Sequence, residues 1–408
     1  EVTELNGLEI DRPASIGDDY AVYVNNMNNP TSVVGYRNGN EWFDAKGLRV
    51  SDPSVLALAT SNGKIQPLLV DHEEQTINKG SFKSYEPIIN VLPRVFFSFP
   101  INTQAVFFAS YDRLAQRPPD AQSYVPLSTY YNIQAFTNSV IPNGEMKPRI
   151  RTAYDVGFKQ LVGQRAQLEL RTSYATIQND FNQIRLEQAY PFSYTTYSNV
   201  DFSTIKSYSM EYQYNGKKLD LMGSYTLQFA DGTGSNVNAA STLLQSGQPN
   251  LRSLYPLSFD VRHSLKGSAV MYLSKLQPAK RKGLSGMVFR NSFVSFNVRS
   301  LSGTPYTAIV APVPAAQAVA TRTQVKGQPF GSRMPWQHNL DFKYEKNIPM
   351  GVEMVDGKPR VKNSMSFYVM VNNLLNTQQI FNVYSYTGSP NDDGYLNSPQ
   401  GQQNAEAQ

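Results

Sequence analysis

A strict period of two in the side chains is the feature of this sequence that most constrains its fold. Over residues 219–229, apolar or small residues at odd positions alternate with mostly polar ones at even positions, as in Leu219, Asp220 and Leu221. The same pattern recurs over 168–175 and 207–214. Successive side chains of a β-strand point to opposite faces, so these runs predict strands with one apolar and one polar face.

The length of these runs favours a membrane over water. A usual strand has about five or six residues, whereas a tilted strand that crosses a bilayer needs about 9–11. The sequence contains no apolar run of about 18 residues, the length expected of a membrane-spanning helix. Backbone groups in lipid must all be paired, so a sheet of such strands has to close on itself. We therefore predict an all-β fold, a transmembrane antiparallel β-barrel with long extracellular loops.

The predicted strands are joined by connections that alternate between short and long. Outer-membrane barrels have short periplasmic turns and long extracellular loops. A soluble propeller is the competing all-β architecture, but its strands are spaced evenly. The short connections are 101–104, 163–165 and 215–218, the long ones are 113–148, 178–200, 231–256 and 308–335, and two of middling length are 277–284 and 347–364.

The pattern divides the chain into three parts. Residues 93–385 are predicted to hold about ten transmembrane strands with short periplasmic turns. Residues 1–92 show weak alternation and many turn residues, so we expect mostly extracellular loop with a few strand pieces. Residues 386–408 are expected to be extracellular loop, with the terminal strand of the barrel missing.

Composition agrees with a barrel in the bacterial envelope. Charged residues make up only 17% of the chain, and Tyr and Phe number 25 and 21. Aromatic rings suit strands and the boundaries between lipid and water. There is no cysteine, which excludes disulfides and thiolate sites and is typical of an oxidising compartment. The net charge of +5 is mild and scattered, so no nucleic-acid partner is expected.

Several motifs, in order along the chain, resemble the barrel of TonB-dependent outer-membrane receptors, in particular the Oar-like type of Bacteroidota. Ser302 to Thr307 match the motif SGTPYT as it stands, whereas Gly144, Met146 and Asp155 depart from the family pattern. The segments that carry the resemblance are 107–111 with 116–119, 143–148 with 152–158, 260–265, 302–307, 333–341, 371–376 and 387–396.

The resemblance implies that this chain is the C-terminal part of a barrel of about 22 strands, closed by an N-terminal plug. It implies energised import of a ligand bound at the extracellular face of the outer membrane. The implied partners are membrane lipid, a periplasmic TonB-type energising protein that acts through the plug, and a surface lipoprotein or other envelope-complex subunits. A passive porin, or a structural barrel subunit of a larger envelope complex, is the alternative. Siderophore, vitamin, glycan and peptide all stay open as substrates.

Candidate binding residues lie near the bases of the long loops. Arg and Trp are favoured types at binding hot spots, so we expect Arg113, Arg117, Arg333 and Trp336 to contact ligand. Asp392 and Asp393 could chelate calcium, since hard cations prefer clustered oxygens. An Asp-Gly turn is the alternative for that pair.

Catalysis is not expected. The three histidines show no metal-binding spacing such as HExxH. Asp260 and His263 could suggest a hydrolase, but residues three apart on a strand point to opposite faces, and no serine lies in a nucleophile motif. We therefore predict a protein that is not an enzyme and needs no cofactor.

Overall fold

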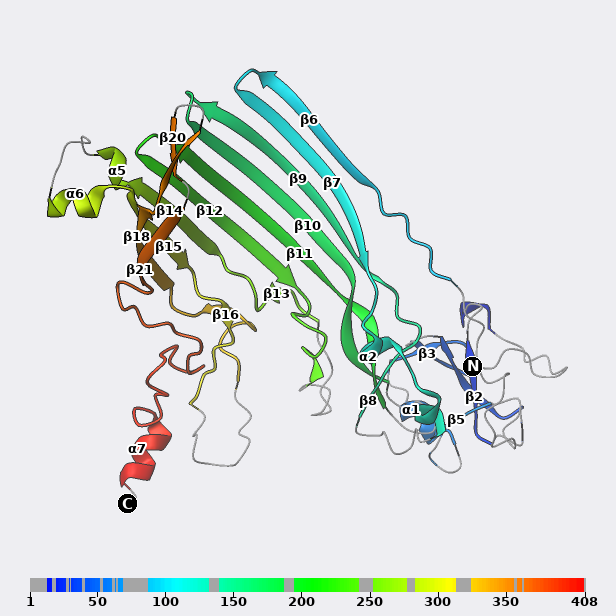
Figure 1. Ribbon diagram of the computed structural model, residues 1–408. Helices are drawn as coiled ribbons and strands as arrows, with labels where there is room; N and C mark the ends of the chain where they lie inside the picture. Colours follow the sequence, from blue (N-terminus) through cyan, green and yellow to red (C-terminus); the bar gives the residue numbers. More distant parts are fainter. Residues whose placement is uncertain are drawn as a thin grey trace.

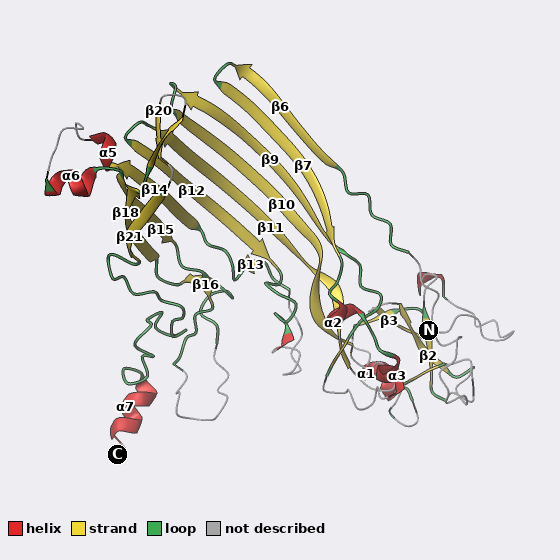
Figure 2. Cartoon of the chain, viewed as in Figure 1, coloured by secondary structure: helices red, strands yellow, loops and turns green. Residues whose placement is uncertain are grey.

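The computed structural model describes residues 13–16, 20–26, 29, 31–38, 41–51, 54–60, 63, 65–68, 87–131, 139–186, 194–241, 252–276, 283–312, 324–355, 358–361 and 363–406. The fold is all-β, with a few short helices at the ends of the strands (Figure 2). Across these residues, no helix has the length and apolar character needed to cross a membrane.

Ten strands form one antiparallel sheet in which each strand pairs with its neighbours along this path (Figure 1). We call it the main sheet. Its strands are β6 (Arg94–Asn102), β7 (Ala105–Gln116), β9 (Arg149–Val162), β10 (Ala166–Leu186), β11 (Tyr194–Asn215), β12 (Leu219–Gly232), β14 (His263–Tyr272), β15 (Ser292–Leu301), β18 (Gln337–Pro349) and β21 (Ser364–Val371). Two short strands pair beside this path, β8 (Val140–Ile141) with β11 and β13 (Tyr255–Pro256) with β12. The predicted all-β class and antiparallel sheet are confirmed.

The register of the main sheet sorts its side chains onto two faces. Directly paired residues point to the same face, so a row of pairs can be followed from strand to strand. One row joins Phe107, Phe158, Leu170, Met210, Tyr225 and Leu265. A second row, three residues further along β7, joins Ser110, Asp155, Ser173, Ser207 and Gln228. We call the first side the apolar face and the second the polar face.

The apolar face continues over the whole width of the main sheet. Many of its side chains are exposed among the described residues, such as Phe97, Val156 and Phe367, and the paired strands repeat the same alternation from β6 to β21. Members of the apolar face include Val95, Phe97, Phe99, Phe107, Tyr154, Val156, Phe158, Leu168, Leu170, Tyr208, Met210, Tyr225, Leu227, Leu265, Phe296, Val298, Leu340, Phe342, Phe367 and Val369.

Residues 1–92, predicted to be mostly loop with a few strand pieces, contain a second sheet of five strands in the order β4-β3-β2-β1-β5. Its core is made of apolar residues that include Val24, Tyr36 and Leu68, all at most 2% exposed. A 3-10 helix and a short α-helix accompany the sheet. These elements are η1 (Ala14–Ile16), β1 (Ala21–Val24), β2 (Val33–Asn38), β3 (Glu41–Asp44), β4 (Arg49–Val50), α1 (Ser54–Leu58) and β5 (Gln66–Pro67).

The predicted long loop 178–200 is wrong over most of its length. β10 continues to Leu186, and β11 begins at Tyr194, so the two strands stay paired far beyond the apolar face. Thr195, Thr196 and Tyr197 are good strand formers, which is why the ladder continues. A bulge between Ile177 and Phe181 contains two shifts of the register, one on each side of Asp180, and Asn179 there has a φ of 57°.

The two middling turns also carry structure of their own. α5 (Leu273–Leu276) and α6 (Leu284–Phe289) flank the first, and the hairpin of β19 (Val352–Val355) and β20 (Lys358–Val361) lies within the second. The long connections carry α2 (Asp120–Ser123), α3 (Leu127–Tyr131) and the paired strands β16 (Pro305–Tyr306) and β17 (Ser332–Arg333), and α7 (Pro399–Glu406) lies near the C-terminus.

Candidate functional site

The connections after β7, β10, β12 and β15 all leave the main sheet at one end, which we call the loop end (Figure 1). The connection after β7 is folded against the extended part of β11. β8 runs parallel to β11, with Val140 opposite Thr195 and Ile141 opposite Thr196. The Thr196 hydroxyl donates to the Ile141 carbonyl at 2.8 Å. These bonds fix the connection to the same strands that cross the main sheet.

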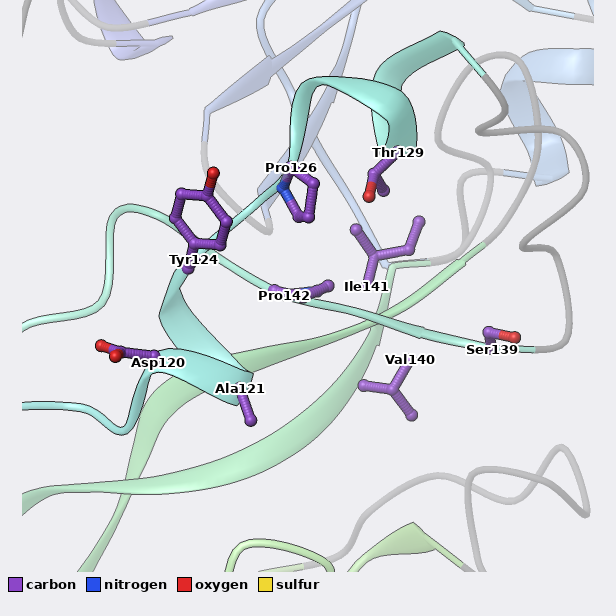
Figure 3. A pocket seen from close by; sticks show the side chains of 9 residues that line it. All are labelled: Asp120, Ala121, Tyr124, Pro126, Thr129, Ser139, Val140, Ile141 and Pro142. Carbon is purple, nitrogen blue, oxygen red and sulfur yellow. The ribbon is translucent and has the colours of Figure 1, made fainter.

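A cavity of about 490 Å³ lies inside this connection. Figure 3 shows that one wall comes from the α2–α3 segment, with Asp120 and Tyr124, and the other from β8 and its flanks, with Ile141. Among the described residues that line the cavity, Asp120 and the Tyr124 phenol are the ionisable groups. The cavity is therefore mainly apolar, with a carboxylate and a ring at its edge.

The predicted binding residues Arg113 and Arg117 do not line this cavity, as far as the described residues go. Arg113 is the partner of Thr152 within β7 and β9, and its backbone N–H donates to the Pro93 carbonyl at 3.1 Å. Arg117 follows the end of β7 and is exposed. Both lie at the base of the first long connection, where they were expected.

Arg333 is bound to a buried carboxylate. Asp260 has no exposed side-chain surface and forms ion pairs with Arg333 and, at 3.0 Å, with Arg262. It also accepts a hydrogen bond from the Ala230 backbone N–H at 3.1 Å. Arg333 further donates to the Asp260 carbonyl at 2.6 Å. The group joins the end of β12 to the connections before β14 and β18, so the Arg333 guanidinium is engaged in holding loops together.

Trp336 belongs to a row of stacked rings on the apolar face. Its ring lies 5.7 Å from that of His263 and 6.0 Å from that of His338, with interplanar angles of 16° and 6°. His263 in turn lies 6.2 Å from the Tyr225 ring, whose hydroxyl is 2.8 Å from His263 Nδ1. The structure therefore puts Trp336 among rings at the loop end of the apolar face.

Asp392 and Asp393 each cap a local turn. Asp392 Oδ1 accepts from the Gly394 N–H at 2.8 Å, and Asp393 Oδ1 accepts from the Tyr395 N–H at 2.9 Å. In the part of the chain that the structure describes, no group of three or more His, Cys, Asp or Glu residues is arranged to hold a metal ion.

Sequence reasoning missed a buried polar cluster in the extended part of β10 and β11, beyond the apolar face. Asp201 accepts from Asn182 Nδ2 at 2.6 Å and from the Thr233 hydroxyl at 2.9 Å. Burial raises the pKa of the Asp201 carboxyl above its ordinary value, against the opposing effect of these two hydrogen bonds and of Arg252. Gly234 packs so closely on the carboxylate that a Cβ there would lie 1.9 Å from Oδ2. The sequence Thr233-Gly234 is the local signal of this close packing against the Asp201 carboxylate.

No model of a protein family matches this chain, and no curated protein does. Solved structures do resemble it. The outer membrane transporter YddB from Escherichia coli is 10% identical with a TM-score of 0.45, and the match covers 69% of this chain and 36% of that one. The ferric-catecholate import receptor Fiu from E. coli K12 is 15% identical with a TM-score of 0.41, covering 70% of this chain and 30% of that one.

The copper transporter OprC is 11% identical with a TM-score of 0.39, covering 70% of this chain and 33% of that one. This chain thus spans about a third of the length of these three structures.

Proposed function

We propose that the main sheet is part of the wall of a bacterial outer-membrane β-barrel that transports a solute. The observation that carries this proposal is the separation of the two faces. Large apolar side chains on the apolar face stay uncovered, such as Val156 at 47% and Phe367 at 55% exposed. Apolar surface of this extent is not left in water by a folded protein, and hydrocarbon chains would cover it.

The charges of the main sheet support the same reading. Its ion pairs lie on the polar face, as in Lys159 with Glu169 at 3.4 Å and Lys343 with Glu345 at 2.7 Å. Lys206 and Lys346 point to the apolar side. Lys206 is paired with Tyr174 near the loop end, and Lys346 lies three residues before the end of β18, at the opposite end of the main sheet. A long cationic side chain at the edge of a membrane can reach the headgroups. The polar face would line an aqueous lumen.

Aromatic side chains lie in a row across the main sheet near the loop end, where the proposed membrane would meet water. Tyr111, Tyr154 and Tyr174 are directly paired across β7, β9 and β10, with successive ring centroids 5.2 and 6.3 Å apart. The row of Tyr225, His263, Trp336 and His338 continues this belt on later strands. Aromatic rings collect at membrane–water boundaries because they are apolar at one side and polar at the other.

A wall in lipid also needs both of its edge strands paired. β6 and β21 end the path of the main sheet, and each pairs with one strand only in the described part of the chain. Unpaired backbone groups cost several kcal/mol each in hydrocarbon. We therefore propose that further strands complete the barrel in the membrane.

Energised import is the mode of transport that we propose, with a TonB-type periplasmic protein as the source of energy and a surface lipoprotein as a further partner. The motifs that resemble the TonB-dependent receptors support this, and the proposal assigns the protein no covalent chemistry and no cofactor. The alternative is a passive porin or a structural barrel subunit of an envelope complex. The charged polar face is the feature that favours it, because porins have charged, open lumens.

Site-directed labelling tests the membrane topology. The chain has no cysteine, so single cysteines can be placed at neighbouring positions of β10. We expect Leu168→Cys and Leu170→Cys to be quenched by nitroxide lipids, and Glu169→Cys and Arg171→Cys to react with a water-soluble maleimide. Equal reaction of all four with the aqueous reagent would contradict a membrane wall.

The mode of transport needs a second experiment. Mass determination and terminal peptide mapping of the protein from its native membrane would show whether a plug belongs to it. Uptake that stops when the energising protein is deleted supports import, and uptake that continues supports the passive alternative.

A further inference from the structure

Two cations face each other on the polar face without a carboxylate between them. Lys266 of β14 is directly opposite Arg299 of β15. In the same row of directly paired residues, Glu169 forms an ion pair with Lys159 at 3.4 Å. Within the described residues, neither Lys266 nor Arg299 has a carboxylate at ion-pair distance. Like charges directly opposite each other destabilise a sheet, so this pair favours an anion. The complete row is Lys159, Glu169, Glu211, Ser224, Lys266, Arg299 and Asn339.

A cavity lies beside one of these cations. It has a volume of about 250 Å³ and is lined by Arg299 and Leu301 of β15, Gln337, His338 and Asn339 of β18, and Gln379 of the following segment. The register puts the side chains of Arg299, Leu301, Gln337 and Asn339 on the polar face, whereas His338 belongs to the ring row of the apolar face. We call this cavity the Arg299 pocket. Its volume is slightly below the usual 300–1,000 Å³ range of ligand pockets, which suits a group about the size of one sugar ring.

The amides of the Arg299 pocket have a defined orientation. Gln337 Nε2 donates to the Ile380 carbonyl at 2.7 Å, and Gln379 Nε2 donates to the His338 carbonyl at 2.9 Å. Asn339 Nδ2 donates to both oxygens of Asp341 at 3.0 Å. Because these acceptors are carbonyl or carboxylate oxygens, the amide nitrogens must face them. Three amide oxygens are then left to accept hydrogen bonds beside one guanidinium.

Asp341 is the nearest carboxylate along β18, and it is already occupied. It accepts the two bonds from Asn339 and one from the Asn373 backbone N–H at 2.8 Å. It pairs with Asn297, one position beyond Arg299 on the polar face. The local charge of Lys266, Arg299 and Asp341 together stays positive.

We propose that the Arg299 pocket binds an acidic sugar. The anionic group would accept from the Arg299 guanidinium, with Lys266 beside it, and the ring hydroxyls would donate to the oxygens of Gln337, Asn339 and Gln379. A guanidinium binds carboxylate and phosphate with two parallel hydrogen bonds, so uronates and sugar phosphates share this chemistry. The inference rests on the proposed function, in which the polar face lines a lumen that solutes reach.

Equilibrium binding to the purified protein in detergent micelles tests this site. The probes are glucuronate, glucose 6-phosphate, glucose and acetate, which separate charge from hydroxyl groups. We expect at least one acidic sugar to bind tenfold or more tightly than both glucose and acetate. Which of the two does so identifies the anion.

Three variants locate the binding. Arg299→Gln should weaken acidic-sugar binding about tenfold or more, Arg299→Lys should weaken it less, and Lys266→Gln should weaken it severalfold, as expected for charge-assisted bonds. Arg171→Gln is the matched control, since it removes a cation from the same face that already faces Asp155 at 3.9 Å. Its binding should equal that of the wild type.

The proposal is overturned if neither acidic sugar binds more tightly than glucose, or if Arg299→Gln binds like the wild type. Binding in micelles needs no transport and no bilayer, so it is independent of the labelling at residues 168–171. Sugar binding with failed labelling would sustain the site and reject the membrane wall. Successful labelling without sugar binding would reject the site alone.

Discussion

The small N-terminal sheet and the main sheet use the same kinds of apolar residue in opposite ways. In the small sheet, Val24 is fully buried and Tyr36 is 2% exposed, because strands and helix enclose them. In the main sheet, Val369 lies on the apolar face and is 60% exposed. The first arrangement buries its apolar side chains within the protein, whereas in the proposed barrel the second has hydrocarbon around it. Solvent, more than composition, therefore separates the two regions.

The largest difference should appear when a large side chain is truncated. Tyr36→Ala leaves a cavity in the small sheet and should cost about 3–5 kcal/mol of its unfolding free energy. Tyr208→Ala on the apolar face leaves no cavity, since lipid chains fill the space, and should cost roughly 1 kcal/mol.

The two tryptophans make this measurable, because Trp42 lies in the small sheet and Trp336 in the belt. Denaturant titrations of Trp336→Phe proteins would follow Trp42 alone, and those of Trp42→Phe proteins would follow Trp336. Equal costs at the two tyrosines would remove the distinction between the regions.

A charge should be tolerated on one face of the main sheet and not on the other. Leu170→Arg puts a guanidinium on the apolar face and should lower folding stability in a bilayer by about 2–4 kcal/mol. Ser173→Arg, three residues along β10 on the polar face, should change it by less than about 0.5 kcal/mol. Refolding into lipid vesicles at graded urea concentrations gives both values. A similar loss for the two variants would mean that the faces are not in different solvents.

The ring belt should contribute a smaller amount. Trp336→Leu keeps an apolar side chain but removes the stacking with His263 and His338, each pair contributing about 0.5–1.5 kcal/mol. Melting temperatures should fall by more in a lipid bilayer than in micelles of a detergent with a small, uncharged headgroup. No difference between the two media would show that the row is packing alone, without a role at the membrane boundary.

The smallest effect concerns pH in the extended part of β10 and β11. Since burial raises the pKa of the Asp201 carboxyl, the folded state favours its protonated form. Its contribution to stability is then fully present below the unfolded pKa and is lost as pH rises through the raised folded value. Hydrogen exchange at residues 182–183 and 233–240 should become faster over that rise. Asp201→Asn should flatten the pH dependence, and an unchanged slope would assign it to other groups.

Much of the main sheet could be predicted because its two faces differ in polarity. In β12, the alternation from Leu219 to Phe229 shows this difference directly in the sequence. The small sheet leaves a weaker mark, since its strands have six residues or fewer. The extension of β10 and β11 was missed because polar strand formers there resemble loop residues.

The candidate site was less accessible to sequence reasoning. Arg333 and Trp336 were placed at a loop base, but their contacts depend on distant residues. Asp260 precedes Arg333 by 73 positions, and His263 reaches Trp336 only through the pairing of β14, β15 and β18. The Arg299 pocket likewise needs the register of β15 and β18 and the segment that brings Gln379 back to them. Such contacts form only when the sheet is assembled, so no local sequence pattern predicts them.

The bulge at Ile177–Phe181 interrupts the regular pairing within the long hairpin of β10 and β11. On one side of it, the two strands are held by their neighbours in the main sheet, and on the other they carry β8 and the wall of the larger cavity. Continuous ladders resist bending, so a change of angle concentrates where the pairing is broken. The bulge therefore sets the direction in which the outer half of the hairpin leaves the main sheet. That direction fixes where the cavity lies relative to the loop end.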